Sequence, residues 1–446
     1  MKSVMQHSFA EVTNIKTPRS SFNRSHGLKS TFDAGKLIPV FVDEVIPGDT
    51  FNLRMSHFAR LATPLTPVMD NMYLDSFFFF VPSRLIWTNH QKFHGEQDDP
   101  GDSTDFSIPT MSVASGGYAN GSLSDYLQLP TEHHASNTLT HSAMLHRAYA
   151  MCWNEHFRDQ NLQDKVVVSL ADGPDTTTSN VVLNRGKRHD YFTSCLPWPQ
   201  KADAGAVSLP LGTSAPITSD STQVEWNSAG DSVNRLGYIG SQNLELTTTA
   251  TSGAMRFGTN TGLVANLTGA TASTIDDLIL SFQTQALYRR DAKAGTRYPE
   301  LVHSHYGVKP YDLLFRPLYL GGGSSPINVH PVANQSGTGT QGELTGFATS
   351  SGTGAGFVQS FVEHGYIIGM VSARADLTYQ EGIDRMYSKS DRFDFYYPAL
   401  ANLGEQSVLN KEIFADGSAS DETVFGYQER WAEYRFKQSR ITGQFR

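Results

Sequence analysis

The chain has 446 residues, with 35 Lys and Arg against 44 Asp and Glu and a formal net charge of −9 at pH 7. Only 18% of the residues are charged and 39% are hydrophobic, so neutral polar residues are abundant, which favours strands and long loops over charge-laced helices. The longest purely apolar run, Phe77 to Pro82, is far too short for a membrane helix and argues against an α-helical membrane protein.

The length suits one all-β core that carries large insertions. The first nine residues contain no apolar segment, so we expect no secretory signal. Two cysteines, Cys152 and Cys195, lie outside any C-x-x-C arrangement and indicate a reducing compartment such as a bacterial cytoplasm.

Basic residues gather at the two ends of the chain. Residues 1–36 hold six Lys and Arg against two acidic residues, and residues 430–446 hold five against one. Basic ends on an acidic body are typical of a protein that contacts nucleic acid on one side, although solvated ends fit the same pattern. The candidate nucleic-acid-facing residues are Lys16, Arg19, Arg24, Lys29, Arg435, Lys437 and Arg440.

The N-terminal third is predicted to be rich in strands. An extended run covers 37–45, the sequence Pro47-Gly48-Asp49 predicts a turn, and apolar residues alternate with polar ones from Phe51 to Met55. Residues 73–81 are mostly apolar and aromatic and predict a buried strand that Pro82 ends.

The middle of the chain mixes loops and helices. Residues 96–105 form an acidic loop that lacks the order of an EF-hand, and a short helix is expected near the end of 116–130. Helical spacing of apolar residues predicts an amphipathic helix over 140–162. Short strands are predicted at 166–168 and 181–183.

Two polar segments contain too few large apolar residues to form a core. Residues 201–273 are interpreted as a surface insertion and residues 321–356 as a Gly/Ser/Thr-rich loop. Between them a capping box predicts a helix over 274–295 that ends at a glycine. Strands are predicted from Phe357 onward and over 427–436.

No catalytic constellation stands out. The glycine run 321–323 lacks the lysine of a phosphate-binding loop, and the histidine pairs at 133–134 and 303–305 lack partners at zinc spacing. We therefore expect no enzyme activity, no cofactor and no metal site. The rival interpretation is a secreted β-sandwich that binds or degrades polysaccharide, which needs a signal peptide and, for catalysis, paired carboxylates.

Six blocks, in order, resemble the major capsid proteins of the Microviridae and in particular of the gokushoviruses. They are FFFFVPSRLIWTNHQKFHGE (77–96), HRAYAMCWNEHFRDQNLQD (146–164), RGKRHDYFTSCLPWPQK (185–201), LYRRDAKAGTRYPELVHSHYGV (287–308), GYIIGMVSARADLTYQEGIDRMYS (365–388) and VFGYQERWAEYRFKQSRITGQFR (424–446). Members of that family usually continue beyond the block that ends here at Arg446.

This resemblance implies a single all-β capsid domain over 1–446, an eight-stranded antiparallel jelly-roll β-sandwich with large loop insertions and a few helices. It further implies self-assembly into a T=1 icosahedral shell around circular single-stranded DNA, with 201–273 as an exterior protrusion. The expected partners are further copies of the chain, the genomic DNA, small DNA-binding and scaffolding phage proteins and a host receptor. The expected location is the virion, assembled in the host cytoplasm without membrane insertion.

Overall fold

The computed structural model describes residues 18–62, 68, 70–103, 105–131, 138–176, 178, 180–201, 275–333, 344–401 and 404–445, and six short strands between 217 and 265. The chain forms two compact units. Unit 1 comprises Met1–Arg158, Lys165–Gly186 and Arg316–Asp376, and unit 2 comprises Asp159–Asp164, Lys187–Phe315 and Leu377–Arg446. The division arises because the C-terminal residues build a separate small core with the segment that follows residue 187.

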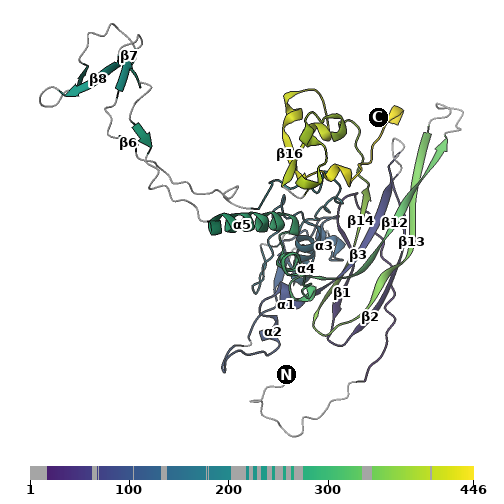
Figure 1. Cartoon of the computed structure of the whole chain (residues 1–446). Helices are drawn as coiled ribbons and strands as arrows, with labels where there is room; N and C mark the ends of the chain where they lie inside the picture. The colour runs from purple at the N-terminus through teal and green to yellow at the C-terminus, as the bar shows by residue number, and fades with distance from the viewer. Residues whose placement is uncertain are drawn as a thin grey trace. The chain divides into compact units, whose positions relative to one another are not determined.

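Unit 1 is built on a six-stranded antiparallel sheet with the strand order β1-β14-β3-β12-β13-β2 (Figure 1). The strands are β1 (Ile38–Val45), β2 (Thr50–Arg60), β3 (Met72–Pro82), β12 (Leu318–Ala333), β13 (Leu344–Ser360) and β14 (Gly365–Ala375). Strands β1 and β2 lie at opposite edges although a short turn joins them, so the sheet must curl until its two edges approach each other.

The predicted N-terminal strands are confirmed. The turn between β1 and β2 has Gly48 at φ +94°, a conformation that glycine adopts without steric cost. Strand β2 alternates between exposed and half-buried residues, and β3 is almost wholly buried, with Phe78 and Phe80 each 1% exposed. The ring of Phe78 lies 5.7 Å from that of Phe357 in β13, so aromatic side chains of strands that are not paired meet inside the curl.

The expectation of a loop over 321–356 is wrong, because the described residues of this segment lie in the long strands β12 and β13. Their glycines allow close approach of neighbouring backbones. A Cβ atom on Gly322 would lie 2.1 Å from the Ser76 carbonyl oxygen, and one on Gly356 would lie 2.0 Å from that of Leu53. Glycine here permits strand pairing and does not signal a loop.

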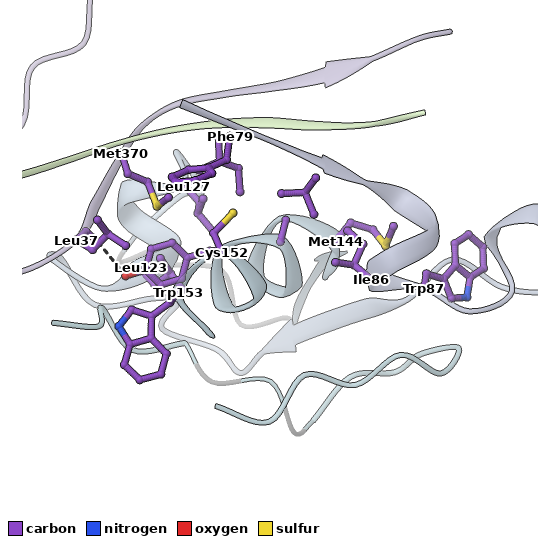
Figure 2. Packing of buried hydrophobic residues seen from close by; sticks show 14 residues of the cluster. Leu37, Phe79, Ile86, Trp87, Leu123, Leu127, Met144, Cys152, Trp153 and Met370 are labelled. Atoms are coloured by element: carbon purple, nitrogen blue, oxygen red, sulfur yellow. Dashed lines mark hydrogen bonds between the residues drawn. The ribbon is translucent and has the colours of Figure 1, made fainter. Parts of the chain in front are cut away.

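The main core of unit 1 lies between the sheet and the helices beside it (Figure 2). These helices are α1 (Ser83–Ile86), α2 (His90–Phe93), α3 (Leu123–Tyr126) and α4 (Met144–Cys152), and a π-helix (Trp153–Phe157) continues α4. The Tyr149 hydroxyl donates to the Leu37 carbonyl at 2.8 Å and thereby ties α4 to the residue before β1. The predicted helix over 140–162 is shorter, because β5 (Leu139–Ser142) pairs with β4 (Thr110–Val113) first.

The short strands predicted at 166–168 and 181–183 are absent from the described residues there, and side chains bind the backbone instead. The Val166 N–H donates to Asn154 Oδ1 at 2.9 Å, and the Leu183 N–H donates to the Tyr149 hydroxyl at 3.0 Å. These tertiary contacts override the β propensity of the valines.

Unit 2 contains the α-helices α5 (Ile275–Ala294) and α6 (Tyr298–Tyr306), together with a two-stranded sheet of β15 (Glu405–Leu409) and β16 (Val424–Glu429). Its small core contains Tyr191, Phe192, Val408 and Ala432. Helix α5 confirms the prediction over 274–295, since Gly295 follows it with φ +96°. Residue 274 lies outside the described residues.

The strand predicted over 427–436 ends at Glu429, because Trp431 takes a left-handed backbone conformation with φ 59°. A 3-10 helix (Ala432–Tyr434) follows. Within 201–273 the described residues form short antiparallel strands, which are β6 (Ile217–Ser219), β7 (Glu225–Ser228), β8 (Val233–Tyr238), β9 (Leu244–Leu246), β10 (Met255–Phe257) and β11 (Leu263–Ala265).

The fold is therefore all-β, with mostly antiparallel strands in a curled sheet and few helices, as the β-sandwich of a viral capsid protein requires. The largest sheet of the described residues has six strands. Among the described helices, none combines the length and apolar character needed to cross a bilayer.

Candidate nucleic-acid interface

The N-terminal candidates for contact with nucleic acid lie in unit 1 and differ in whether a protein group already binds their positive charge. Arg24 forms an ion pair with Asp43 at 2.7 Å, and Arg19 Nη1 donates to the Gly48 carbonyl at 2.8 Å. Lys29 is exposed and has no ion-pair partner among the described residues, while Lys16 lies outside them. Lys29 is thus the N-terminal candidate whose charge is most available to a phosphate.

The C-terminal candidates in unit 2 lie beside carboxylates. Arg435 forms an ion pair with Glu429, and Lys437 Nζ lies 3.2 Å from Asp384 Oδ2. Arg440 donates to the Gly382 carbonyl at 2.7 Å, and its second guanidinium nitrogen lies 3.8 Å from Asp384. The structure therefore brings Lys437 and Arg440 together around one acidic residue.

Asp384 is ionised under the influence of these cations. Burial opposes its charge, but hydrogen bonds from the Met386 N–H and from Lys437, with the positive charges of Lys437 and Arg440, outweigh burial and hold its pKa below the ordinary value. One negative charge thus offsets part of the positive charge of both cations, which reduces the attraction that they can exert on a phosphate.

A larger set of cations and rings lies in unit 2 next to these residues. We call it the aromatic–basic surface, and its members are Lys389, Arg392, Phe393, Phe395, Tyr396, Tyr397 and Tyr434. Lys389 Nζ lies 4.3 Å from the centre of the Tyr434 ring and donates to its hydroxyl at 2.6 Å. The Arg392 guanidinium lies 5.5 Å from the Tyr397 ring. Among the described residues, neither cation forms an ion pair with a carboxylate.

Two segments that are separate in the sequence form this surface. The Tyr396 ring lies 5.2 Å from the buried Trp431 ring and 6.3 Å from the Tyr434 ring, which joins residues 385–397 to the C-terminal segment. Tyr396 is 52% exposed and Tyr434 is 57% exposed, so their rings remain accessible. Trp431 itself is only 4% exposed and belongs to the interior.

Exposed rings beside cations can hold single-stranded nucleic acid, because a base stacks on the ring while the cation meets the phosphate. The same composition is also common at protein–protein contacts, where aromatic residues and Arg are enriched. Sequence analysis selected Arg435 and Lys437 for their charge but missed 389–397. The signal that marks this segment is the presence of two basic and four aromatic residues in KSDRFDFYY (389–397), which also contains Asp391 and Asp394.

Unit 1 also contains a charge network that sequence reasoning missed. Asp75 on β3 accepts hydrogen bonds from Ser324, Arg185 and Arg374, at 2.5 Å from Ser324 and 2.7 Å from Arg374. Both guanidinium groups also lie over aromatic rings of β3, at 5.0 Å for Arg185 and Phe77 and 4.6 Å for Arg374 and the neighbouring Tyr73. The network fastens the segment around residue 185 and strand β14 to β3.

The other candidates from the sequence show structural contacts. In the acidic loop, Asp98 forms an ion pair with Lys92 at 3.0 Å, and His305 lies 2.6 Å from Asp291. Both cysteines are free thiols, and burial raises the pKa of Cys152 and also raises that of Cys195, to about 12. The histidine pair at 133–134, a candidate from the sequence, lies outside the described residues.

Comparison with known proteins agrees with this architecture. A family model described as "Capsid protein (F protein)" matches residues 10–446. Capsid protein VP1 of Bdellovibrio phage phiMH2K is 45% identical over 99% of this chain and 85% of its own length. The VP1 proteins of Chlamydia phage 1 and Spiroplasma virus 4 are 36% and 33% identical over 100% and 99% of this chain, and over 87% and 84% of their own lengths. The chain therefore belongs to this family of phage capsid proteins and is a structural component of the virion.

Proposed function

We propose that this capsid protein closes into a T=1 icosahedral shell with circular single-stranded DNA inside, and that its sheet completes a jelly-roll sandwich. Helix α5 carries the proposal. Ile275, Ile279 and Phe282 follow helical spacing and form one apolar stripe on α5, yet Ile275 is 76% exposed, Ile279 52% and Phe282 65%, and Ala292 is the one described residue of the helix that is buried. A helix stripe of this kind is stable in water only when another surface covers it.

Further copies of the chain are the proposed cover for α5. Covering a side chain such as Phe282 stabilises a contact by about 1.5–3 kcal/mol, and repetition of the contact by symmetry multiplies the effect over the shell. Obligate interfaces of this kind are more apolar than transient ones, which fits the many exposed aromatic residues of unit 2.

The test places a charge in the stripe of α5. Phe282→Asp is expected to abolish closed particles in electron micrographs and to leave smaller species in sedimentation, because an unpaired carboxylate in an apolar contact is costly. Gln283→Asp, at an exposed neighbouring position of the same helix, is the matched control and should assemble. Normal assembly of Phe282→Asp would contradict the proposal for α5.

We further propose that the aromatic–basic surface and the basic ends of the chain face the DNA. The basic residues in question are Lys16, Arg19, Arg24, Lys29, Arg435, Lys437 and Arg440. Lys29 and the rings around Lys389 and Arg392 support this proposal most strongly, because no carboxylate in the described part of the chain pairs with these cations.

Tyr434 tests this proposal. Tyr434→Ala removes the ring and is expected to weaken the affinity of the unassembled chain for oligo-dT by about 1–3 kcal/mol, whereas Tyr434→Phe keeps the ring and should bind normally. Fluorescence anisotropy at fixed salt measures both. If Tyr434→Ala bound DNA normally but failed to assemble, the surface would be a subunit contact. Joint neutralisation of Lys16, Arg19, Arg24 and Lys29 should reduce packaging and its salt sensitivity.

Residues 201–273 are proposed as the exterior protrusion that contacts a host receptor, since this polar segment contains short strands of its own. Deletion of the segment should abolish adsorption to host cells while particles still form. Unchanged adsorption would refute this placement.

Small DNA-binding and scaffolding phage proteins are the proposed assembly partners, with assembly in the host cytoplasm. Pull-down of the capsid protein from infected cells, before and after lysis of the cells, tests both the partner proteins and the place of assembly.

We also propose that the protein has no catalytic activity. The expectation follows from its role as a shell component and from the lack of a recognisable catalytic constellation in the sequence. Incubation with a panel of glycans tests the rival interpretation as a polysaccharide-degrading enzyme, and turnover of any glycan by purified particles would contradict the proposal.

A further inference from the structure

Three histidines of unit 1 come together from two separate segments. His90 and His94 lie at the start and just beyond the end of α2, and His364 lies immediately before β14. One ring nitrogen of each can be chosen so that all three lie within 4.8 Å of one another. The ring centres of His94 and His364 are 4.6 Å apart, as are those of His90 and His94.

Local structure fixes these positions. Two histidines four residues apart lie on one face of a helical turn, which brings His90 and His94 together. The Ser83 N–H donates to the His364 carbonyl at 3.0 Å, so the backbone of the segment before β14 is held against α1. Arg84 donates to both carboxylate oxygens of Glu363, at 2.8 and 3.4 Å, and adds a second link between the same segments.

The histidines line a cavity of about 330 Å³. Glu96 and Glu363 line the same cavity, so carboxylate oxygens stand beside the imidazoles. Arg84 is the cation in this lining, and its ion pair with Glu363 offsets its charge. The cavity therefore offers three nitrogen donors and an acidic wall with little uncompensated positive charge.

The imidazole of His90 is partly buried beside the rings of His94 and His364. If all three rings were protonated, their positive charges would lie side by side and repel one another.

We propose that His90, His94 and His364 bind a divalent transition-metal ion of the zinc type. Three imidazole nitrogens with a fourth position open to water or a carboxylate such as Glu96 form a recognised zinc-binding arrangement. The ion would connect α2 to His364, the residue immediately before β14, and so would fasten the α2 segment to the sheet. Sequence analysis weighed the histidine pairs at 133–134 and 303–305 and expected no metal. It did not consider this cluster, because His364 is far from His90 and His94 along the chain.

The test measures metal binding by the full chain after treatment with a chelator. Calorimetric titration with Zn²⁺ is expected to give one ion per wild-type chain. His94→Gln and His364→Gln should each weaken binding by at least about 10–100-fold, the loss that removal of even an outer-shell partner produces. His189→Gln, at an exposed histidine outside the cluster, is the control and should bind as the wild type does.

Cobalt substitution gives a second measurement that needs no variant. Wild-type protein loaded with Co²⁺ should show the intense visible bands of a four-coordinate nitrogen and oxygen site. A purely octahedral spectrum would overturn the proposal, as would Zn²⁺ binding no tighter in the wild type than in His94→Gln. Either result would mean that the three rings only pack against one another.

Discussion

Arg147 and Asp175 form an ion pair in unit 1 whose two side chains are both 0% exposed. Arg147 Nε donates to Asp175 Oδ2 at 2.9 Å, and the other guanidinium nitrogens donate to the carbonyls of Ile86 at 3.1 Å and Ala171 at 2.9 Å. The Thr178 hydroxyl completes the site by donating to Asp175 Oδ2 at 2.6 Å. Every charge in this cluster has a partner, so loss of one partner leaves a buried charge without compensation.

Asp175→Asn removes the negative charge and keeps the size of the side chain. We expect it to lower the free energy of unfolding by about 3–5 kcal/mol, the usual cost of breaking a buried ion pair from one side. That loss is a large part of the roughly 5–15 kcal/mol that stabilises a typical domain. Replacement of both partners, as in Arg147→Met with Asp175→Leu, should cost less, because no buried charge is then left unpaired.

Denaturant unfolding of the unassembled chain, followed by tryptophan fluorescence, measures this loss. Trp87 and Trp153 both lie in the core of unit 1 and report on it. The control is Asp98→Asn, the same change in the exposed pair with Lys92, which should cost no more than about 1 kcal/mol. Equal effects of the two Asp→Asn changes would refute the reasoning.

The remaining predictions concern the sheet of unit 1. Burial raises the pKa of Asp75, but the hydrogen bonds that it accepts from Ser324 and two arginines outweigh burial, so the net effect is a lowered pKa. The ionised Asp75 therefore contributes its full stabilisation above the ordinary carboxyl pKa of about 4. This stabilisation is lost as the pH falls below that value and through the lowered pKa. Asp75→Asn should therefore reduce stability at pH 7 and flatten the acid side of the stability profile measured in urea. Gly356→Ala, which places a Cβ 2.0 Å from the Leu53 carbonyl oxygen, should cost about 1–3 kcal/mol or more in thermal unfolding. Gly27→Ala, with open space around it, should be nearly neutral, and equal effects of the two changes would contradict the packing argument.

Sequence analysis predicted the elements that are determined by the pattern of their own residues. The apolar run at 73–81 forms β3, and a capping box with a terminal glycine identified α5. The π-helix after α4 and the turn at Trp431 were not predictable, because they depend on contacts such as the hydrogen bond from the Trp431 N–H to Gln406 Oε1 at 2.8 Å.

The strands β12 and β13 were missed because their composition is typical of loops. Whether a glycine-rich segment pairs or remains a loop depends on the strands that lie beside it, here β3 and β2, and these come from a distant part of the chain. Dependence on distant segments also explains why some site residues were missed. The basic ends were visible as charge, but the aromatic–basic surface and the three histidines require segments that only the fold brings together.

The most direct measurement is electron microscopy of the full chain, expressed alone and with its phage partner proteins. The proposed function predicts closed, uniform particles whose reconstruction has T=1 icosahedral symmetry and places α5 in contact with a neighbouring copy. Soluble monomers under every condition, including co-expression, would contradict self-assembly. Particles in which α5 contacts no other copy would contradict the role given to its apolar stripe.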